Sequence, residues 1–286
     1  MQSQENISAP GLKRRPTIVI QPQRGRLGLN LREIWEYRDL LLILADRDVK
    51  LRYKQTLLGV TWVILQPLAT AIIFTVIFGN FARLPSDGLP YILFVFAGLL
   101  PWNLFSASLS RAGGSLVGSA SLISKVYFPR VLVPLASVGA ILIDFLVAFA
   151  VLVILMIFYR VTPSIRMLTL PFFLLLTLLT SMGVSLLISA LSVYYRDFLF
   201  ALPFVIQFWT YASPVAYAMS IVPEQWRWVF SLNPAVAFIE GFRWALLGSN
   251  GLTWGMVIIS ALSSIVFFIG GLVVFRRIER GFADVI

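Results

Sequence analysis

Residues that could carry chemistry are scarce in this chain of 286 residues. It contains neither Cys nor His, which excludes disulfides, thiol nucleophiles and His-based metal or acid–base chemistry. None of its four Lys residues precedes Ser or Thr, so the Lys motif of a nucleotide-binding phosphate loop is absent. We therefore predict that the chain is not an enzyme, holds no cofactor or metal of its own and does not hydrolyse ATP unaided.

The acidic residues offer two candidate sites. Asp144 is the only carboxylate deep inside an apolar stretch, where an ionisable group usually has a function. A proton relay would need further titratable partners, so we favour a structural hydrogen bond to a neighbouring helix and keep proton coupling or substrate contact as alternatives. Asp46 and Asp48 are a close pair, as a metal-dependent membrane enzyme would need, but they lie among charged residues and are typical of a solvated face.

Six apolar stretches, each long enough to cross a bilayer, must position these residues. A membrane-spanning helix needs about 20 apolar residues. The stretches lie at 54–83, 87–111, 130–160, 166–196 and 197–224, and the last ends at Arg276. Charged residues make up only 13% of the chain, against roughly 25% in soluble domains. We predict an all-α integral membrane protein with six transmembrane helices within residues 55–275.

The basic residues predict the orientation of the chain. Its net charge is +10, which would also suit a nucleic-acid partner. However, 18 of the 23 Lys and Arg residues lie in the segments on the same side of the membrane as the N-terminus. Because basic residues concentrate on the cytoplasmic side, we expect both termini in the cytoplasm and no nucleic-acid partner.

The segments before and after the spans differ in character. Residues 1–29 are rich in Gln, Pro, Arg and Gly and predict a flexible basic tail, and residues 276–286 a short cytoplasmic tail. Residues 30–54 have helical spacing of apolar residues after a capping box at Asn30 and Glu33. They predict an amphipathic helix in the cytoplasmic interface, represented by Trp35, Arg38, Leu42 and Arg47.

Two connecting segments are unusual. Residues 119–128 form a short amphipathic stretch ended by Pro129, which predicts either a cytoplasmic helix able to pass force from a soluble partner or a plain loop. Residues 224–248 contain apolar pieces too short to span, which predicts a re-entrant hairpin on the outer side. Within this hairpin, Glu240 and Arg243 are three residues apart on one helical face and can pair.

Aromatic residues recur along the apolar stretches. Rings can stack on sugar faces, so the following residues are candidates for a carbohydrate path: Phe74, Phe78, Phe105, Trp209, Tyr211 and Tyr217. The alternative is the ordinary aromatic belt at a membrane interface.

Several short motifs follow one another along roughly residues 31–280. They are, in order, Gly98–Trp102, Ser115–Val117, Lys125–Arg130, Tyr195–Asp197, Ser213–Val215, Trp226–Trp228, Asn233–Pro234 and Glu240–Arg243. Together they resemble the permease subunits of ABC-2 type polysaccharide exporters. One departure is the Ser residues at 119, 121 and 124, where relatives often carry Asn and a second Lys.

The resemblance implies the partners of the chain. Such permeases form homodimers in the bacterial cytoplasmic membrane, recruit two copies of a separate ATPase that binds ATP and magnesium, and export lipid-linked O-antigen, teichoic acid or capsular polysaccharide. The segment 119–128 then becomes a coupling helix. The residues expected to contact the ATPase are Ser119, Leu122, Ile123, Lys125, Tyr127, Phe128, Arg130, Arg196 and Asp197.

The expected substrate is a polyprenyl-diphosphate-linked glycan that passes between spans one and five of two copies. Lys50, Arg52 and Lys54, at the cytoplasmic mouth of span one, are candidates for binding the diphosphate, with simple membrane anchoring as the alternative. Three other functions stay open: an ABC-2 exporter of a drug or lipid, a polyprenyl-phosphate glycosyltransferase, and a proton-driven carrier that uses Asp144.

Overall fold

The computed structural model describes residues 31–53, 59, 61–162 and 164–285. Across these residues the chain is helical, and they contain no β-strand. The predicted tail at 1–29, the capping residue Asn30 and the candidate diphosphate residue Lys54 lie outside the described residues.

The helices follow one another with short connections. Their bounds are α1 (Leu31–Glu36), α2 (Arg38–Tyr53), α3 (Thr61–Phe74), α4 (Tyr91–Gly118), α5 (Ala120–Lys125), α6 (Leu132–Phe158), α7 (Leu170–Tyr194), α8 (Asp197–Tyr211), α9 (Glu224–Ser231), α10 (Pro234–Leu247), α11 (Trp254–Ile278) and α12 (Phe282–Val285). A π-helix (Thr75–Phe81) continues α3, and 3₁₀ turns (Ile165–Thr169, Met219–Ile221 and Glu279–Gly281) precede α7, α9 and α12.

Five helical segments of the described chain are long and apolar enough to cross a membrane. They are Thr61–Phe81, Tyr91–Gly118, Leu132–Phe158, Ile165–Tyr194 and Trp254–Gly281. They coincide with five of the six apolar stretches in the sequence, and the chain is a multi-pass membrane protein.

The stretch at 197–224 is not one long helix. It holds the 15-residue helix α8, which at about 22 Å is shorter than a typical hydrocarbon core of about 30 Å. After Tyr211 the backbone forms a turn, which contains Pro214. Because a proline disfavours helical backbone in the residue before it, the helix ends ahead of Ser213 and the rest of the stretch is irregular.

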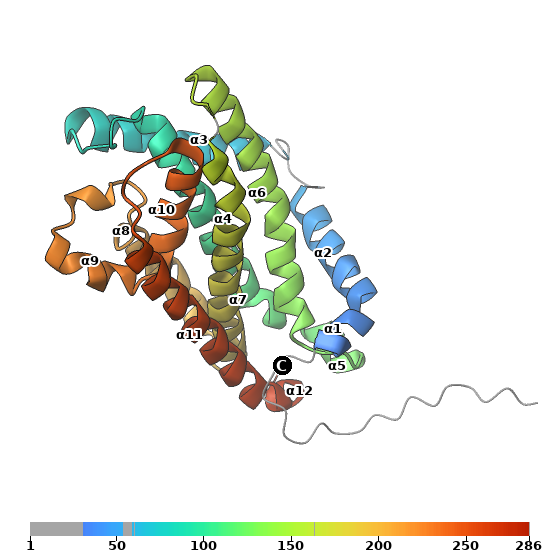
Figure 1. Cartoon of the computed structure of the whole chain (residues 1–286). Coiled ribbons are helices and arrows are strands. Elements are labelled where there is room, and N and C mark those ends of the chain that lie inside the picture. The colour runs from blue at the N-terminus through green and yellow to red at the C-terminus, as the bar shows by residue number, and fades with distance from the viewer. Residues whose placement is uncertain (1–30, 54–58, 60, 163, 286) are drawn as a thin grey trace, which may run out of the picture.

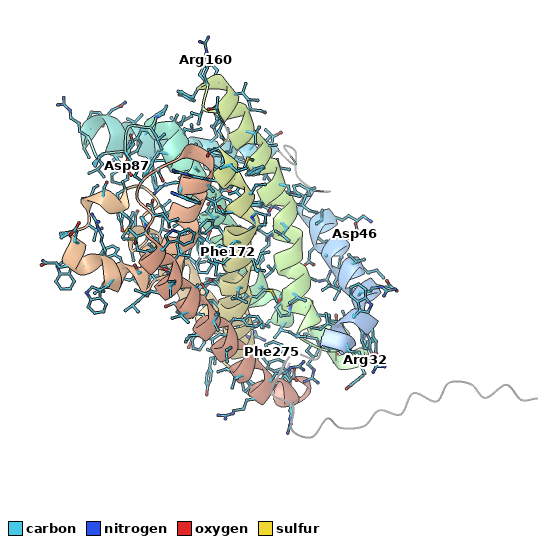
Figure 2. All side chains as sticks on the ribbon, in the orientation of Figure 1. Arg32, Asp46, Asp87, Arg160, Phe172 and Phe275 are labelled. Atoms are coloured by element: carbon cyan, nitrogen blue, oxygen red, sulfur yellow. The ribbon has the colours of Figure 1, made fainter. Side chains whose placement is uncertain are left out.

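The helices α4, α6 and α7 run along the length of the bundle, whereas α3 and its π-helical continuation run across one end (Figure 1). Figure 2 places Asp87 and Arg160 at that end and Arg32 at the opposite end. We call the first the α9 end, because α9 and α10 lie towards it, and the second the α5 end, because α1, α5 and α12 gather there (Figure 1).

The core lies around α4, which packs against α6, α7 and α10. Close backbone approach joins α7 to α11: a Cβ added at Gly271 would lie 1.9 Å from the carbonyl oxygen of Gly183, so only glycine fits there. Small residues at helix contacts are typical of membrane bundles, because dispersion and hydrogen bonding, not water exclusion, hold the helices together.

Candidate functional site

Two cavities line the same face of α4 and meet at Arg111. One has a volume of about 300 Å³ and lies among α3, α4, α6 and α8. The other, of about 440 Å³, lies between α2, α4 and α6 and extends to Ser119, where α5 begins. Arg111 lines both cavities. We call them together the α4 groove.

Polar and small residues of α4 form the floor of the groove. Asn103, Ser106, Ser110, Gly114 and Gly118 line it at intervals of three or four residues, the spacing that places side chains on one helical face. In the sequence, this stripe is a helical periodicity of small and polar residues within an apolar span. The sequence predictions did not include this stripe, which α4 continues as far as Gly118.

The acidic residues of the groove are held by basic neighbours. Asp144 pairs with Arg52 and accepts a hydrogen bond from the Tyr53 hydroxyl. The predicted hydrogen bond from Asp144 to a neighbouring helix is therefore present, and its partners are on α2. Further towards the α5 end, Arg47 donates to Asp48 at 2.8 Å and Ser137 donates to the other Asp48 oxygen at 2.9 Å.

The candidate diphosphate residues occupy different places. Lys50 is exposed, pairs with Asp46 at 2.6 Å and is not among the residues that line the groove. Arg52 does line it but is engaged with Asp144. Burial and the nearby charge of Arg111 lower the pKa of Arg52. Arg111 is a third arginine of the groove, beside Arg47 and Arg52, and it was not among the candidate residues predicted from the sequence.

The predicted coupling segment is only partly helical. The helix α5 has six residues, and Val126, its C-cap, is already extended before Pro129. Phe128 is buried, whereas Lys125 and Tyr127 are exposed, Tyr127 by 64%. The segment thus presents a basic and an aromatic side chain outward at the α5 end.

The remaining predicted coupling residues split into buried and exposed groups. Ser119 and Ile123 are buried and Leu122 is partly buried, so these three pack within the chain. Arg196 and Asp197 are exposed where α8 begins.

The C-terminal residues, predicted as a tail, pack against the bundle instead. Arg130 donates to the carbonyl oxygen of Glu279, and its guanidinium lies 5.9 Å from the ring of Phe282. Phe282 is fully buried beside Phe275 of α11. Burial of the Phe282 ring stabilises the packing of this short segment against the bundle.

The predicted interface helix consists of α1 and α2, separated at Tyr37. The helix α2 packs along α6, where Leu44 is buried and Arg47 pairs with Asp48. Trp35 and Leu42 are 68% and 65% exposed, with the guanidinium of Arg38 5.2 Å from the Trp35 ring. Apolar side chains thus remain on the outer face, as an interfacial helix requires.

The six candidate carbohydrate-path aromatics do not form one path. Phe74 and Phe78 contact each other edge to face on α3 and the π-helix. Phe105 is fully buried in the core, against Trp209 at 4.9 Å between ring centroids. Phe105 therefore packs as a core residue in the structure.

Trp209, Tyr211 and Tyr217 do come together. They line a cavity of about 600 Å³ between α8, α9 and α11, towards the α9 end. Trp209 donates to Asn233 at 2.8 Å. Burial raises the pKa of Tyr217 to about 12, so its phenol stays neutral.

Glu240 and Arg243 form the ion pair that their spacing predicts, at 2.9 Å, and both side chains are fully buried. Arg243 also donates to the carbonyl oxygens of Phe94, Pro214 and Val215. The pair therefore ties α10 to α4 and to the irregular backbone after α8.

Residues 39–247 match the sequence profile of the ABC-2 type transporter family. With an all-helical bundle and its apolar spans, the chain belongs to this family of membrane transport subunits.

Relatives with named functions are similar over most of their length. The chain is 30% identical to an O-antigen export system permease protein RfbA of Klebsiella pneumoniae, over 87% of this chain and 95% of the relative. It is 27% identical to the RfbA protein of Myxococcus xanthus, over 74% of this chain and 82% of the relative. It is 25% identical to the polysialic acid transport protein KpsM of Escherichia coli, over 82% of this chain and 91% of the relative. The predicted resemblance to polysaccharide export permeases is confirmed.

Proposed function

We propose that this chain is the permease subunit of an ATP-driven exporter that moves a polyprenyl-diphosphate-linked polysaccharide across the bacterial cytoplasmic membrane. The names of the relatives support a polysaccharide substrate. The observation that carries the proposal is the α4 groove, a polar surface between apolar helices that extends from mid-bundle to the start of α5. Polar side chains inside a membrane protein usually mark the path of a substrate.

In this proposal the α5 end faces the cytoplasm and docks the ATPase. Exposed Lys125, Tyr127, Arg196 and Asp197 form its contact surface. Two copies of the chain assemble with two ATPase subunits, which bind ATP and magnesium. The short helix α8 acts as the sixth span, and α9 and α10 form a re-entrant hairpin on the outer side.

The diphosphate is the part of the substrate that is hardest to move across the membrane, because it is charged. Burying an unpaired charge in hydrocarbon costs several kcal/mol or more, so the headgroup needs a polar route. ATP binding by the partner would favour one arrangement of the α5 segments over another and so shift the permease towards an open state. Hydrolysis of the ATP would return the permease to its closed state.

Transport in liposomes tests the proposal. Permease and ATPase reconstituted together should move labelled lipid-linked glycan only when ATP is added. Movement without ATP, or movement of the unglycosylated lipid alone, would refute the coupling or the substrate respectively.

The docking surface has its own test. Replacing Lys125 and Tyr127 with Ala should lower permease-stimulated ATPase activity several-fold, while the unfolding temperature stays that of the wild type because both side chains are exposed. The variant Arg277→Ala removes an exposed charge elsewhere at this end and serves as the control. Full stimulation by the double variant would remove the α5 segment from the docking surface.

A further inference from the structure

Arg111 is the one basic residue shared by both cavities of the α4 groove. Its side chain is half-buried, and among the described residues it makes no hydrogen bond or ion pair. An unpaired guanidinium inside a membrane bundle is costly, because the charge has lost water without gaining a partner. A bound anion would offset this cost, because it would pair with the guanidinium.

The other charges of the groove leave Arg111 uncompensated. The carboxylates that line it are Asp48 and Asp144. Asp48 is occupied by Arg47 and Ser137, and Asp144 by Arg52 and Tyr53. With two acids already matched to two arginines, Arg111 leaves one net positive charge in the groove.

The depth of Arg111 suits a lipid headgroup. It lies seven residues before the end of α4 at Gly118, which corresponds to about 10 Å along the helix. Such a position is near the boundary between headgroups and hydrocarbon, where a phosphate at the end of a long apolar chain would sit. A guanidinium binds phosphate oxygens through two parallel N–H groups, which a Lys cannot reproduce.

We propose that Arg111 binds the diphosphate headgroup of the lipid carrier in the α4 groove. Arg52, held by Asp144 beside it, supplies a second guanidinium that the headgroup can recruit. This inference rests on the proposed function and names the residue that receives the substrate, in place of Lys50, which pairs with Asp46 outside the groove.

Binding to the purified permease in lipid nanodiscs tests this assignment without the ATPase. The probe is radiolabelled long-chain polyprenyl diphosphate, with the uncharged polyprenol as the comparison lipid. Arg111→Ala should weaken binding of the diphosphate about ten- to a hundredfold, as expected for loss of charge-assisted hydrogen bonds, and leave polyprenol binding unchanged. Arg111→Lys should recover part of the affinity, and the matched control Arg277→Ala should bind like the wild type.

The charge balance provides a second variant. Asp144→Asn frees Arg52 from its acid and should tighten binding of the diphosphate, whether or not Arg111→Ala can be purified. Wild-type affinity in Arg111→Ala, an equal loss for polyprenol, or weaker diphosphate binding in Asp144→Asn would each overturn the assignment. If wild-type permease exports glycan while Arg111→Ala keeps full diphosphate affinity, the proposed function survives and only this inference fails.

Discussion

The two sides of the bundle differ in how they treat polar groups. Where α4 packs against α7, α10 and α11, polar groups are enclosed: Arg243 and Glu240 are both 0% exposed. Where α4 faces α2, α3 and α6, polar groups border cavities, and Arg52 and Asp144 keep 27% and 11% of their side-chain surface exposed. We call the first side the frame and the second the groove side.

Packing shows the same contrast. In the apolar windows of the spans, 78% of α4 is buried, whereas only 17% of Thr61–Phe81 is. Glycines bring α7 and α11 into backbone contact, and hydroxyls inside α7, such as Thr180, donate to its own backbone and so cost little in an apolar setting. Because this side is the more densely packed of the two, motion during transport is expected on the groove side.

The largest effect is expected at Arg243. Arg243→Ala leaves the charge of Glu240 buried and removes donors from four carbonyl oxygens, so it should destabilise the protein by about 3–5 kcal/mol. Thermal unfolding in detergent measures this loss. Arg227→Ala removes a partly exposed arginine near the same end and should cost about 1 kcal/mol or less. Equal unfolding temperatures for the two variants would contradict the sealed frame.

The contact between α7 and α11 should respond to a single methyl group. Gly271→Ala places a carbon 1.9 Å from the Gly183 carbonyl oxygen, so the helices must separate, at a cost of about 1–3 kcal/mol. Gly270→Ala is the matched control, because nothing lies within 4 Å of its added carbon. Chemical denaturation of both variants gives the comparison, and similar stabilities would mean that α7 and α11 are not in close contact.

On the groove side, stability effects should be smaller. Ser137→Ala removes one hydrogen bond to Asp48, which keeps Arg47, so we expect a loss of about 1–2 kcal/mol. Ser124→Ala, an exposed hydroxyl at the same end, should change nothing measurable. The unfolding temperatures of the two variants show whether the hydrogen bond between Ser137 and Asp48 stabilises the packing of α2 on α6.

The smallest effect is expected at Lys50. Its exposed ion pair with Asp46 is worth about 0.5 kcal/mol at most, so Lys50→Ala should retain stability and glycan export. Export is measured beside Arg111→Ala in the same liposomes. A larger loss of export in Lys50→Ala than in Arg111→Ala would favour Lys50, the residue predicted from the sequence, as the one that binds the diphosphate.

The sequence showed that some residues of the site were unusual, but it could not show which residues they contact. Asp144 was singled out because a carboxylate in an apolar span is rare, yet its partners Arg52 and Tyr53 are about ninety residues away. Phe105 and Trp209 were both candidates for a carbohydrate path, but Phe105 is in the core and Trp209 borders a cavity. Aromatic composition alone does not say which side of a helix meets its neighbours.

The sequence by itself determined the membrane environment, the positions of five long spans, the family and the pairing of Glu240 with Arg243. These depend on hydrophobicity and on contacts within one helical turn, which local spacing settles. Tertiary structure alone decided that Phe282 is buried and that Arg111 lines two cavities without an acid partner. These depend on how helices far apart in the chain pack together, and packing decides which polar groups find partners and which remain for a substrate.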